Sequence, residues 1–305
     1  MTNPRVLVLG AAGFIGRRLA ERLASQGMEV IAATRQPAHF NTSDIYNAVS
    51  SFDDVSHFLP VLAQCTAVIH AASASTPGSS AAQPQLDGNL RTTLALIEAL
   101  QLVPACRLLF LSSGGTLYGN RDTPAVEDDP LRPRSYHGAG KAAAEHFIHA
   151  WSAQYRGTAL ILRPTNVYGP GQPSRSGFGI IPTAFDCALH STPMAIWGDG
   201  AAVRDYLYIE DFLALCDTAL TKPINDGAHV FNAASGEAVT VDALIDHIDA
   251  VTDRPLQRVY LPARRVDIRS IVADTTAART TFDWHPTTPL AEGLRNTWQW
   301  FSTRP

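Results

Sequence analysis

Short apolar runs alternate with stretches of helical periodicity through the first half of the chain. The runs have the length of single strands, and they predict buried strands at residues 6–9, 30–33, 67–69, 108–111 and 159–162. Apolar positions three and four residues apart predict helices at residues 15–25, 86–100 and 139–154. Strands and helices in this alternation are joined by right-handed crossovers, which give a mostly parallel sheet covered on both faces. We therefore expect an α/β fold built on a doubly wound parallel sheet.

The pattern changes after residue 163, because Gly and Pro interrupt it repeatedly up to residue 179. A smaller, loop-rich C-terminal lobe is expected to follow. Its periodicity predicts elements at residues 183–189, 195–197, 209–219 and 241–251, and a return to the main sheet near 229–234. The apolar stripe within residues 290–301 is interpreted as a helix that packs into the core.

Composition and charge mainly exclude certain classes of partner and of site. The chain has 305 residues, of which 46% are hydrophobic and 17% charged, and its formal net charge is -4. No basic block indicates a nucleic acid or an acidic membrane surface, and no apolar stretch reaches the roughly 18 residues of a membrane span. No charged segment precedes a long apolar stretch at the N-terminus, so we expect a cytoplasmic protein. The cysteines lie far apart and predict buried thiols rather than a metal site or disulfides; they are Cys65, Cys106, Cys187 and Cys216.

A glycine motif, Gly10-Ala-Ala-Gly13-Phe-Ile-Gly16, follows the first predicted strand and opens the first predicted helix. In this context Gly10 permits a tight turn, Gly13 lets the backbone approach a pyrophosphate, and Gly16 lets the helix pack closely. The helix N-terminus, with Phe14 and Ile15 in its first turn, offers free amides and a positive dipole to phosphates. The motif therefore predicts a Rossmann-type site for a nicotinamide dinucleotide, NAD(P).

The end of the second predicted strand bears on the choice between NAD and NADP. An enzyme specific for NAD usually has an acidic residue there for the ribose diol, but this chain has Thr34 and Arg35. An arginine suits the 2′-phosphate of NADP, so Arg35 favours NADP over NAD. The alternative, a solvated surface arginine, stays open.

Several further motifs occur in a fixed order along the whole chain. They are His70-Ala71-Ala72, Asn89, Leu111-Ser-Ser-Gly-Gly-Thr-Leu-Tyr-Gly119, Arg163-Pro-Thr-Asn-Val-Tyr-Gly-Pro-Gly171, Ile196-Trp-Gly-Asp-Gly200 and Arg204-Asp-Tyr-Leu-Tyr-Ile-Glu-Asp211. With the glycine motif, they resemble the extended short-chain dehydrogenase/reductase family, in its NAD-dependent epimerase/dehydratase branch, which acts on nucleotide sugars. The resemblance implies that residues 1–165 form the dinucleotide-binding domain and that residues 166–305 are mainly the substrate-binding lobe.

The same resemblance assigns ligand contacts. It places Ala71, Ala72, Ser112 and Lys141 beside the cofactor. It places Asn166, Arg204, Arg264 and Phe178 beside a nucleoside-diphosphate sugar, the expected substrate, and a planar guanidinium is a strong partner for phosphate. Either arginine could instead belong to a surface ion pair. The family's helix pair, which corresponds to residues 86–100 and 139–154, implies a homodimer.

The catalytic centre departs from the family pattern at its hydroxyl residue. Family members carry Ser or Thr four residues before the Tyr of the Tyr-Gly pair, and this chain has Gly114 there. Thr116 would face the same side if the preceding strand continued, so it is the preferred substitute, ahead of Ser113.

The second departure concerns the Tyr-x-x-x-Lys motif, in which the lysine lowers the pKa of a proton-exchanging tyrosine. Lys141 is present, but His137 stands four residues before it and Tyr136 is one place too early. A shift of one residue turns a side chain by about 100° on a helix. Tyr136 would reach the site only if the helix began late or contained a bulge. We therefore expect His137 to be the acid/base, with Tyr136 as the alternative and a surface or capping histidine as a further possibility.

These observations favour an NAD(P)-dependent epimerase that acts at C4 of a nucleoside-diphosphate hexose through a 4-keto intermediate. An NADPH-dependent 4-ketoreductase is the first alternative. A catalytically degenerate nucleotide-sugar-binding protein is the second, because of Gly114 and His137. A dehydratase ranks lower, since the acidic residue that elimination needs is replaced by Gly115.

Overall fold

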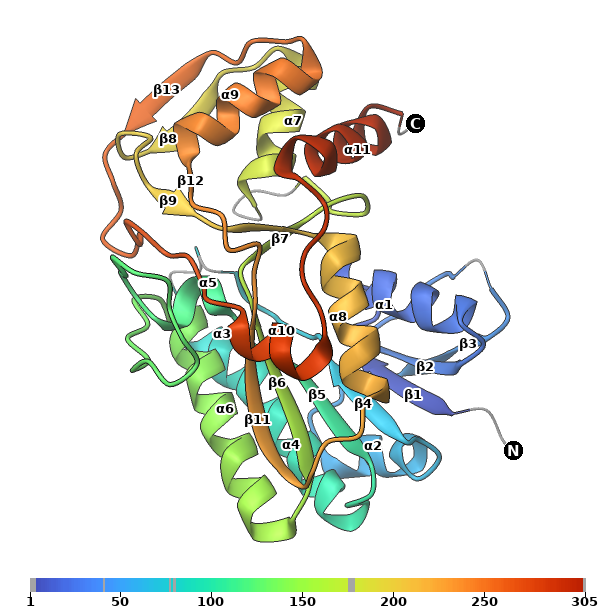
Figure 1. The fold of residues 1–305 in the computed structure, drawn as a ribbon. Coiled ribbons are helices and arrows are strands. Elements are labelled where there is room, and N and C mark those ends of the chain that lie inside the picture. Colours follow the sequence, from blue (N-terminus) through green and yellow to red (C-terminus); the bar gives the residue numbers. More distant parts are fainter. Residues whose placement is uncertain (1–3, 41, 77, 79–80, 175–178, 304–305) are drawn as a thin grey trace.

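The core of the molecule is a seven-stranded sheet in which every pairing is parallel (Figure 1). The computed structural model describes residues 4–40, 42–76, 78, 81–174 and 179–303. The strand order is β11-β6-β5-β4-β1-β2-β3, so the order reverses between β1 and β4. The strands are β1 (Arg5–Leu9), β2 (Glu29–Thr34), β3 (Ile45–Val49), β4 (Ala67–His70), β5 (Arg107–Leu111), β6 (Thr158–Pro164) and β11 (Gly227–Ala233). The predicted doubly wound fold is confirmed.

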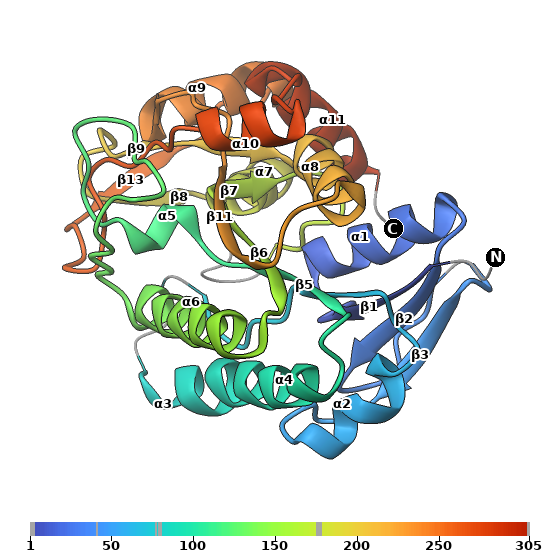
Figure 2. The ribbon, with the colours of Figure 1, turned by 60° about the horizontal axis from the view of Figure 1, so that its bottom comes forward.

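Helices cover both faces of this sheet. Figure 2 shows α2 (Val55–Leu62), α4 (Arg91–Leu102) and α6 (Tyr136–Tyr155) on one face, with α1 (Phe14–Ser25) and α8 (Ile209–Thr221) on the other. Successive residues of β1 enter different cores: Val6 and Val8 pack with α1 and α8, whereas Leu7 and Leu9 pack with α2 and α4. Because both faces are buried, the central strands β1, β4 and β5 are almost entirely apolar, which explains why their positions could be predicted.

The remaining elements form a second lobe above the carboxyl end of the sheet (Figure 1). It contains β7 (Asn166–Tyr168), α7 (Ile180–His190), β8 (Met194–Trp197), β9 (Val203–Arg204), β10 (Tyr206–Tyr208), β12 (Val239–Thr240), α9 (Val241–Thr252), β13 (Arg258–Leu261) and α11 (Leu290–Ser302). The chain returns to the main sheet at β11, close to the expected residues, and α10 (Thr276–Phe282) packs beside it. The aromatic stripe of α11 is core, since the Phe185 ring lies 5.4 Å from that of Trp298 and 5.9 Å from that of Phe301.

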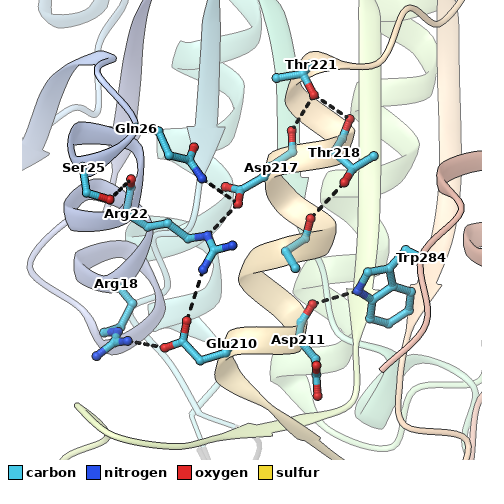
Figure 3. A network of polar contacts seen from close by, with 11 residues as sticks. Arg18, Arg22, Ser25, Gln26, Glu210, Asp211, Asp217, Thr218, Thr221 and Trp284 are labelled. Atoms are coloured by element: carbon cyan, nitrogen blue, oxygen red, sulfur yellow. Dashed lines mark hydrogen bonds and ion pairs between the residues drawn. The ribbon is translucent and has the colours of Figure 1, made fainter. Parts of the chain in front are cut away.

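A cluster of charges joins α1 to α8 (Figure 3). Arg22 Nε donates to Asp217 at 2.6 Å, and its Nη1 lies 3.2 Å from Glu210. Arg18 forms a second ion pair with Glu210, and Gln26 donates to Asp217 at 3.0 Å. The cluster therefore ties the helix that follows the glycine motif to the helix that follows β10.

Three expectations about elements need correction or comment. The helix expected at residues 86–100 is composite: α3 (Gln83–Gln85) leads into a π-helical turn, η1 (Leu86–Leu90), and then α4. The α6 helix begins at Tyr136 rather than near residue 139, and β5 is followed by the short helix α5 (Gly114–Leu117) rather than by more strand. The four cysteines are free and buried, as predicted.

Within the described part of the chain, no helix has the length and hydrophobicity needed to cross a bilayer. The same residues contain no group of His, Cys, Asp and Glu that could bind a metal ion.

Candidate active site

The turn between β1 and α1 is tightly packed around its glycines. Gly10 has φ +88°, and a Cβ there would lie 2.7 Å from the backbone of Ala72 at the end of β4. A Cβ on Gly16 would lie 2.2 Å from the Gly10 carbonyl oxygen, so side chains are excluded at both positions. Gly13 precedes the first turn of α1, and no side chain caps this helix end, which begins with Phe14 and Ile15. The turn therefore presents bare backbone and a positive helix end, the arrangement that suits a pyrophosphate.

Arg35 follows β2 on the same edge of the sheet, and its side chain is exposed. The neighbouring Thr34 is buried, and its hydroxyl has no hydrogen-bond partner among the described residues. No carboxylate occupies the end of this strand, so the position has room and charge for an added phosphate.

His137 and Lys141 lie one turn apart on the buried face of α6. Each side chain is 7% exposed. Lys141 Nζ donates to the Leu111 carbonyl oxygen at 2.7 Å, at the carboxyl end of β5, and lies 4.7 Å from the centre of the Phe110 ring. Ser135 caps the helix by accepting from the Gly138 amide at 3.1 Å. The structure thus brings the two predicted catalytic residues together at the edge of the sheet that carries the glycine turn.

Burial shifts the ionisation of both groups. Burial, with a smaller contribution from the charge of Lys141, lowers the pKa of His137 to about 4, so the imidazole is neutral at pH 7. Burial also lowers the pKa of Lys141 to about 8, although the carboxylate of Glu145 opposes that shift. A neutral imidazole can accept a proton, as the sequence-based hypothesis for His137 requires.

A cluster of uncharged side chains surrounds His137, and sequence reasoning missed most of it. Ser75 Oγ lies 3.0 Å from His137 Nδ1 and 2.7 Å from Gln85 Oε1. Asn89 Nδ2 donates to Ser75 Oγ and to Gln85 Oε1, in both cases at 2.9 Å. Asn89 belongs to the motifs quoted above, but Ser75 lies in a loop without recognisable periodicity. The π-helical turn that holds Asn89 also carries no sequence signal.

The expected hydroxyl substitute is placed differently from the prediction. Because residues 114–117 form helix α5, the condition that a strand continues to Thr116 is not met, and that argument for Thr116 was wrong. Thr116 is buried and its Oγ1 donates to Ser113 Oγ at 2.8 Å, so the two candidate hydroxyls contact each other. At Gly114 a Cβ would lie 2.6 Å from the Arg163 carbonyl oxygen. The position typical of the catalytic hydroxyl therefore has no space for a side chain.

Tyr136 points away from this cluster. It is the first residue of α6, and its side chain is 51% exposed, in contrast to buried His137. The helix neither begins late nor contains a bulge, so neither condition for Tyr136 to reach the site is met.

The predicted cofactor residue Ser112 faces the core. Its hydroxyl donates to Glu145, which forms a buried ion pair with Arg163 at 2.7 Å. Arg163 Nη1 also donates to the Tyr118 hydroxyl at 2.8 Å, and Tyr118 donates to Asn232 Oδ1 at 2.6 Å. The Ser112 side chain is therefore part of a buried network that anchors β5, α6, β6 and β11 to one another.

The predicted substrate residues come from the second lobe. Asn166 in β7 donates to the Asp205 carbonyl oxygen at 2.8 Å, and its amide lies 4.0 Å from a Cβ built on Gly115. Arg204 in β9 is partly buried, which lowers its pKa, and the charge of Arg264 contributes in the same direction. Arg264 pairs with Asp267 at 2.7 Å and stacks 5.3 Å from the Trp197 ring. Phe178 lies outside the described residues.

Comparison with known proteins places the chain in a family. The model of the NAD dependent epimerase/dehydratase family matches residues 6–234. A UDP-glucose 4-epimerase of Mycolicibacterium smegmatis is 30% identical, covering 98% of this chain and 99% of its own. A dTDP-4-dehydro-6-deoxyglucose reductase of Escherichia coli is 27% identical, with 95% of each chain covered. The structure of a Thermus thermophilus UDP-glucose 4-epimerase in complex with NAD has a TM-score of 0.90 at 27% identity, over 98% of this chain and 99% of that one. The resemblance inferred from the motifs is confirmed, and the chain belongs to the NAD dependent epimerase/dehydratase family.

Proposed function

We propose that this protein is a nucleotide-sugar 4-epimerase that uses a tightly held nicotinamide dinucleotide. The observation that carries the proposal is the buried His137–Lys141 pair at the carboxyl end of a complete doubly wound sheet, next to an uncapped helix end. The full-length similarity to UDP-glucose 4-epimerases supports the substrate class. Ligands of doubly wound sheets bind at this edge, where the strand order reverses.

The described residues fit such a cofactor. The backbone of the turn around Gly10 and Gly13 would hold the pyrophosphate, and Arg35 would lie near the adenosine ribose. The nicotinamide supplies a reversible hydride acceptor for C4 of the sugar. In this proposal His137 accepts the proton of the 4-hydroxyl as C4 is oxidised and returns it on reduction, while Lys141 binds the cofactor ribose and keeps the imidazole neutral.

The proposed substrate contacts come from the second lobe. Asn166 and Arg204 would bind the diphosphate, and Arg264 is a third candidate once it is released from Asp267. The partly buried position of Arg204 strengthens its attraction for an anion, because water screens the charge less there.

Turnover of sugar nucleotides tests the proposal. We would incubate the purified protein with UDP-glucose, UDP-galactose, UDP-glucuronic acid and dTDP-glucose, with NAD or NADP, and follow the sugars by proton NMR. Interconversion of 4-epimers without net consumption of cofactor is the expected result. Release of a bound dinucleotide on denaturation, identified by mass spectrometry, would show which cofactor is retained.

A 4-ketoreductase is the second candidate. Similarity to the dTDP-4-dehydro-6-deoxyglucose reductase of Escherichia coli and the exposed Arg35 favour it. A reductase would oxidise one NADPH for each 4-keto sugar, which absorbance at the reduced-nicotinamide band measures directly. Binding of sugar nucleotides without either reaction would favour the non-catalytic alternative that Gly114 and His137 raise.

A further inference from the structure

The hydrogen-bond donors and acceptors around His137 indicate which ring nitrogen carries the proton of the neutral imidazole. We propose that Ser75, oriented by Gln85 and Asn89, is a positioning residue that holds neutral His137 with its proton on Nδ1 and its basic lone pair on Nε2. The proposal concerns a ground-state tautomer. Its catalytic consequence rests on the proposed function, but the tautomer itself can be measured without turnover.

The backbone amide of Ala74 determines the orientation of the Asn89 side chain, because a backbone N–H can only donate a hydrogen bond. The Ala74 N–H donates to the side chain of Asn89 at 2.7 Å, so the contacted atom is the amide oxygen Oδ1. The other terminal atom of Asn89 is therefore Nδ2, which can only donate. It lies 2.9 Å from both Ser75 Oγ and one terminal atom of Gln85. That atom of Gln85 must be the acceptor Oε1.

The proton of Ser75 is then assigned. Gln85 Oε1 can only accept, and it lies 2.7 Å from Ser75 Oγ, so the serine hydroxyl donates to it. Ser75 has one proton, and this bond uses it. Toward His137 Nδ1, 3.0 Å away, Ser75 can therefore only accept, and Nδ1 must carry the hydrogen.

The opposite orientation of Gln85 fails on the same contacts. It would set a donor NH₂ group 2.9 Å from the Asn89 NH₂ group, two donors facing each other. The assigned orientation leaves Gln85 Nε2 buried without a partner among the described residues, which is unfavourable for a donor removed from water. In exchange, Ser75 Oγ makes three hydrogen bonds and Gln85 Oε1 makes two.

The consequence for a general base is specific. In neutral imidazole one nitrogen donates and the other accepts, so the bond at Nδ1 decides which nitrogen can take a proton. With Nδ1 protonated, Nε2 has the free lone pair. A tyrosine at this position, as in the family pattern, would need a strongly lowered pKa before its phenol could accept a proton. The neutral imidazole of His137 needs only the correct tautomer, and uncharged side chains set that tautomer.

The test is the ¹⁵N NMR spectrum of His137 in the full-length protein at pH 7. A long-range proton–nitrogen correlation, assigned by its loss in His137→Gln, reports a pyrrole-type shift for the protonated nitrogen and a pyridine-type shift for the basic one. We expect Nδ1 to be pyrrole-type. A pyridine-type Nδ1 in the unsubstituted protein would overturn the proposal whether or not the protein turns over any sugar.

Two substitutions at Gln85 sharpen the test. In Gln85→Met the Ser75 proton loses its acceptor and can turn to Nδ1, so the tautomer should switch to Nε2–H. In Gln85→Glu an acceptor oxygen remains, and the native tautomer should persist. Gln83→Ala, an exposed glutamine on the same turn of α3, is the matched control and should change nothing. Retention of the native tautomer in a folded Gln85→Met variant would contradict the assigned direction of the Ser75 bond.

Turnover provides a second readout if the proposed function holds. Gln85→Met and Ser75→Ala should lower kcat by tenfold or more with little change in KM, because the residues proposed to bind the diphosphate lie outside this cluster. Ser75→Thr, which keeps the hydroxyl, should restore most of the loss in Ser75→Ala. A native tautomer without activity on any sugar nucleotide would refute the proposed function and leave this inference standing.

Discussion

His137 offers proton transfer to a site that has no tyrosine at the usual position. We expect His137→Ala to lower kcat/KM about a hundredfold or more, the usual range for a lost general base. Tyr136→Phe should keep most of the activity, because Tyr136 is 51% exposed and its ring points away from Lys141. Steady-state kinetics on the best sugar nucleotide would measure both. A large loss in Tyr136→Phe with an active His137→Ala would mean that α6 adopts another register when substrate binds.

Acid should destabilise the fold through His137. Burial and Lys141 lower the pKa of His137 to about 4, whereas an unfolded histidine has a pKa near 6.5. Between these values the unfolded chain binds a proton that the folded chain does not, so stability falls as pH decreases through this window. Relative to His137→Gln, the native protein should lose on the order of 3 kcal/mol of unfolding free energy between pH 7 and pH 4. Urea titrations of both proteins at several pH values would check this, and parallel curves would contradict it.

Arg35 should matter for one cofactor only. We expect Arg35→Asp to weaken NADPH binding by about tenfold or more, because a 2′-phosphate would lose a cation and meet a carboxylate. NADH binding should change far less. Fluorescence titration with both cofactors measures the difference, and Arg156→Asp, an exposed arginine after α6, controls for the change in net charge. Equal weakening of both cofactors would show that Arg35 is a solvated bystander.

The residues that could be predicted are those whose type is demanded by backbone geometry or by a family motif. Gly10 and Gly16 belong to this group, since neither position accepts a Cβ. Ser75 and Gln85 could not be found, because serine and glutamine are common in loops and their roles depend on contacts across ten residues of irregular chain. The loss of the hydroxyl at Gly114 was visible in the sequence, but its cause, the carbonyl of Arg163, was not.

At the scale of elements, burial decided what periodicity could predict. The central strands β1, β4 and β5 are apolar except for one terminal residue each, because both of their faces are covered, and they were located within a residue or two. Edge strand β3 was missed, since Tyr46, Asn47 and Val49 lie on an open edge and do not repeat an apolar pattern. The short helix α5 was missed as well, because two glycines give little helical signal.

The charge cluster between α1 and α8 should contribute measurably to stability. Arg22 contacts two carboxylates and is 31% exposed, so Arg22→Met should lower the unfolding free energy by about 1 kcal/mol, the upper range for partly exposed pairs. Arg91→Met is the matched control, because Arg91 makes a single looser pair with Asp87 and is 58% exposed. Its loss should be a few tenths of a kcal/mol. Equal losses in chemical denaturation would show that the cluster adds nothing beyond an ordinary surface pair.

At the scale of the whole molecule, α4 and α6 lie side by side on one face of the sheet (Figure 2). Phe147 on α6 is 45% exposed and Leu102 at the end of α4 is 67% exposed. We predict a homodimer through these helices, with the twofold symmetry that is commonest among soluble oligomers. Light scattering should give twice the chain mass for the native protein and for Tyr46→Glu, a control on the distant strand β3. Phe147→Glu should give monomers, and a monomeric native protein would refute the prediction.

The overall architecture was predictable because many weak local signals agree on it. Alternating strands and helices imply the doubly wound sheet, and the break after residue 163 marks the start of the second lobe. The order of the strands and the pairing of β11 with β6 depend on long-range contacts that no local pattern encodes.

The close approach of the Arg163 carbonyl to Gly114 also bears on how this protein can change over generations. A serine at residue 114 would collide with the end of β6, and that strand is held in place by the buried contacts of Arg163 with Glu145 and Tyr118. The hydroxyl found elsewhere in the family therefore cannot be regained by one exchange. A serine at residue 114 would be accommodated only with a second substitution that moves the end of β6. The variant with the serine alone would be destabilised by the collision and would gain no activity from the new hydroxyl. At a fixed β6, proton transfer in this site therefore depends on residues other than residue 114, and His137 is the candidate.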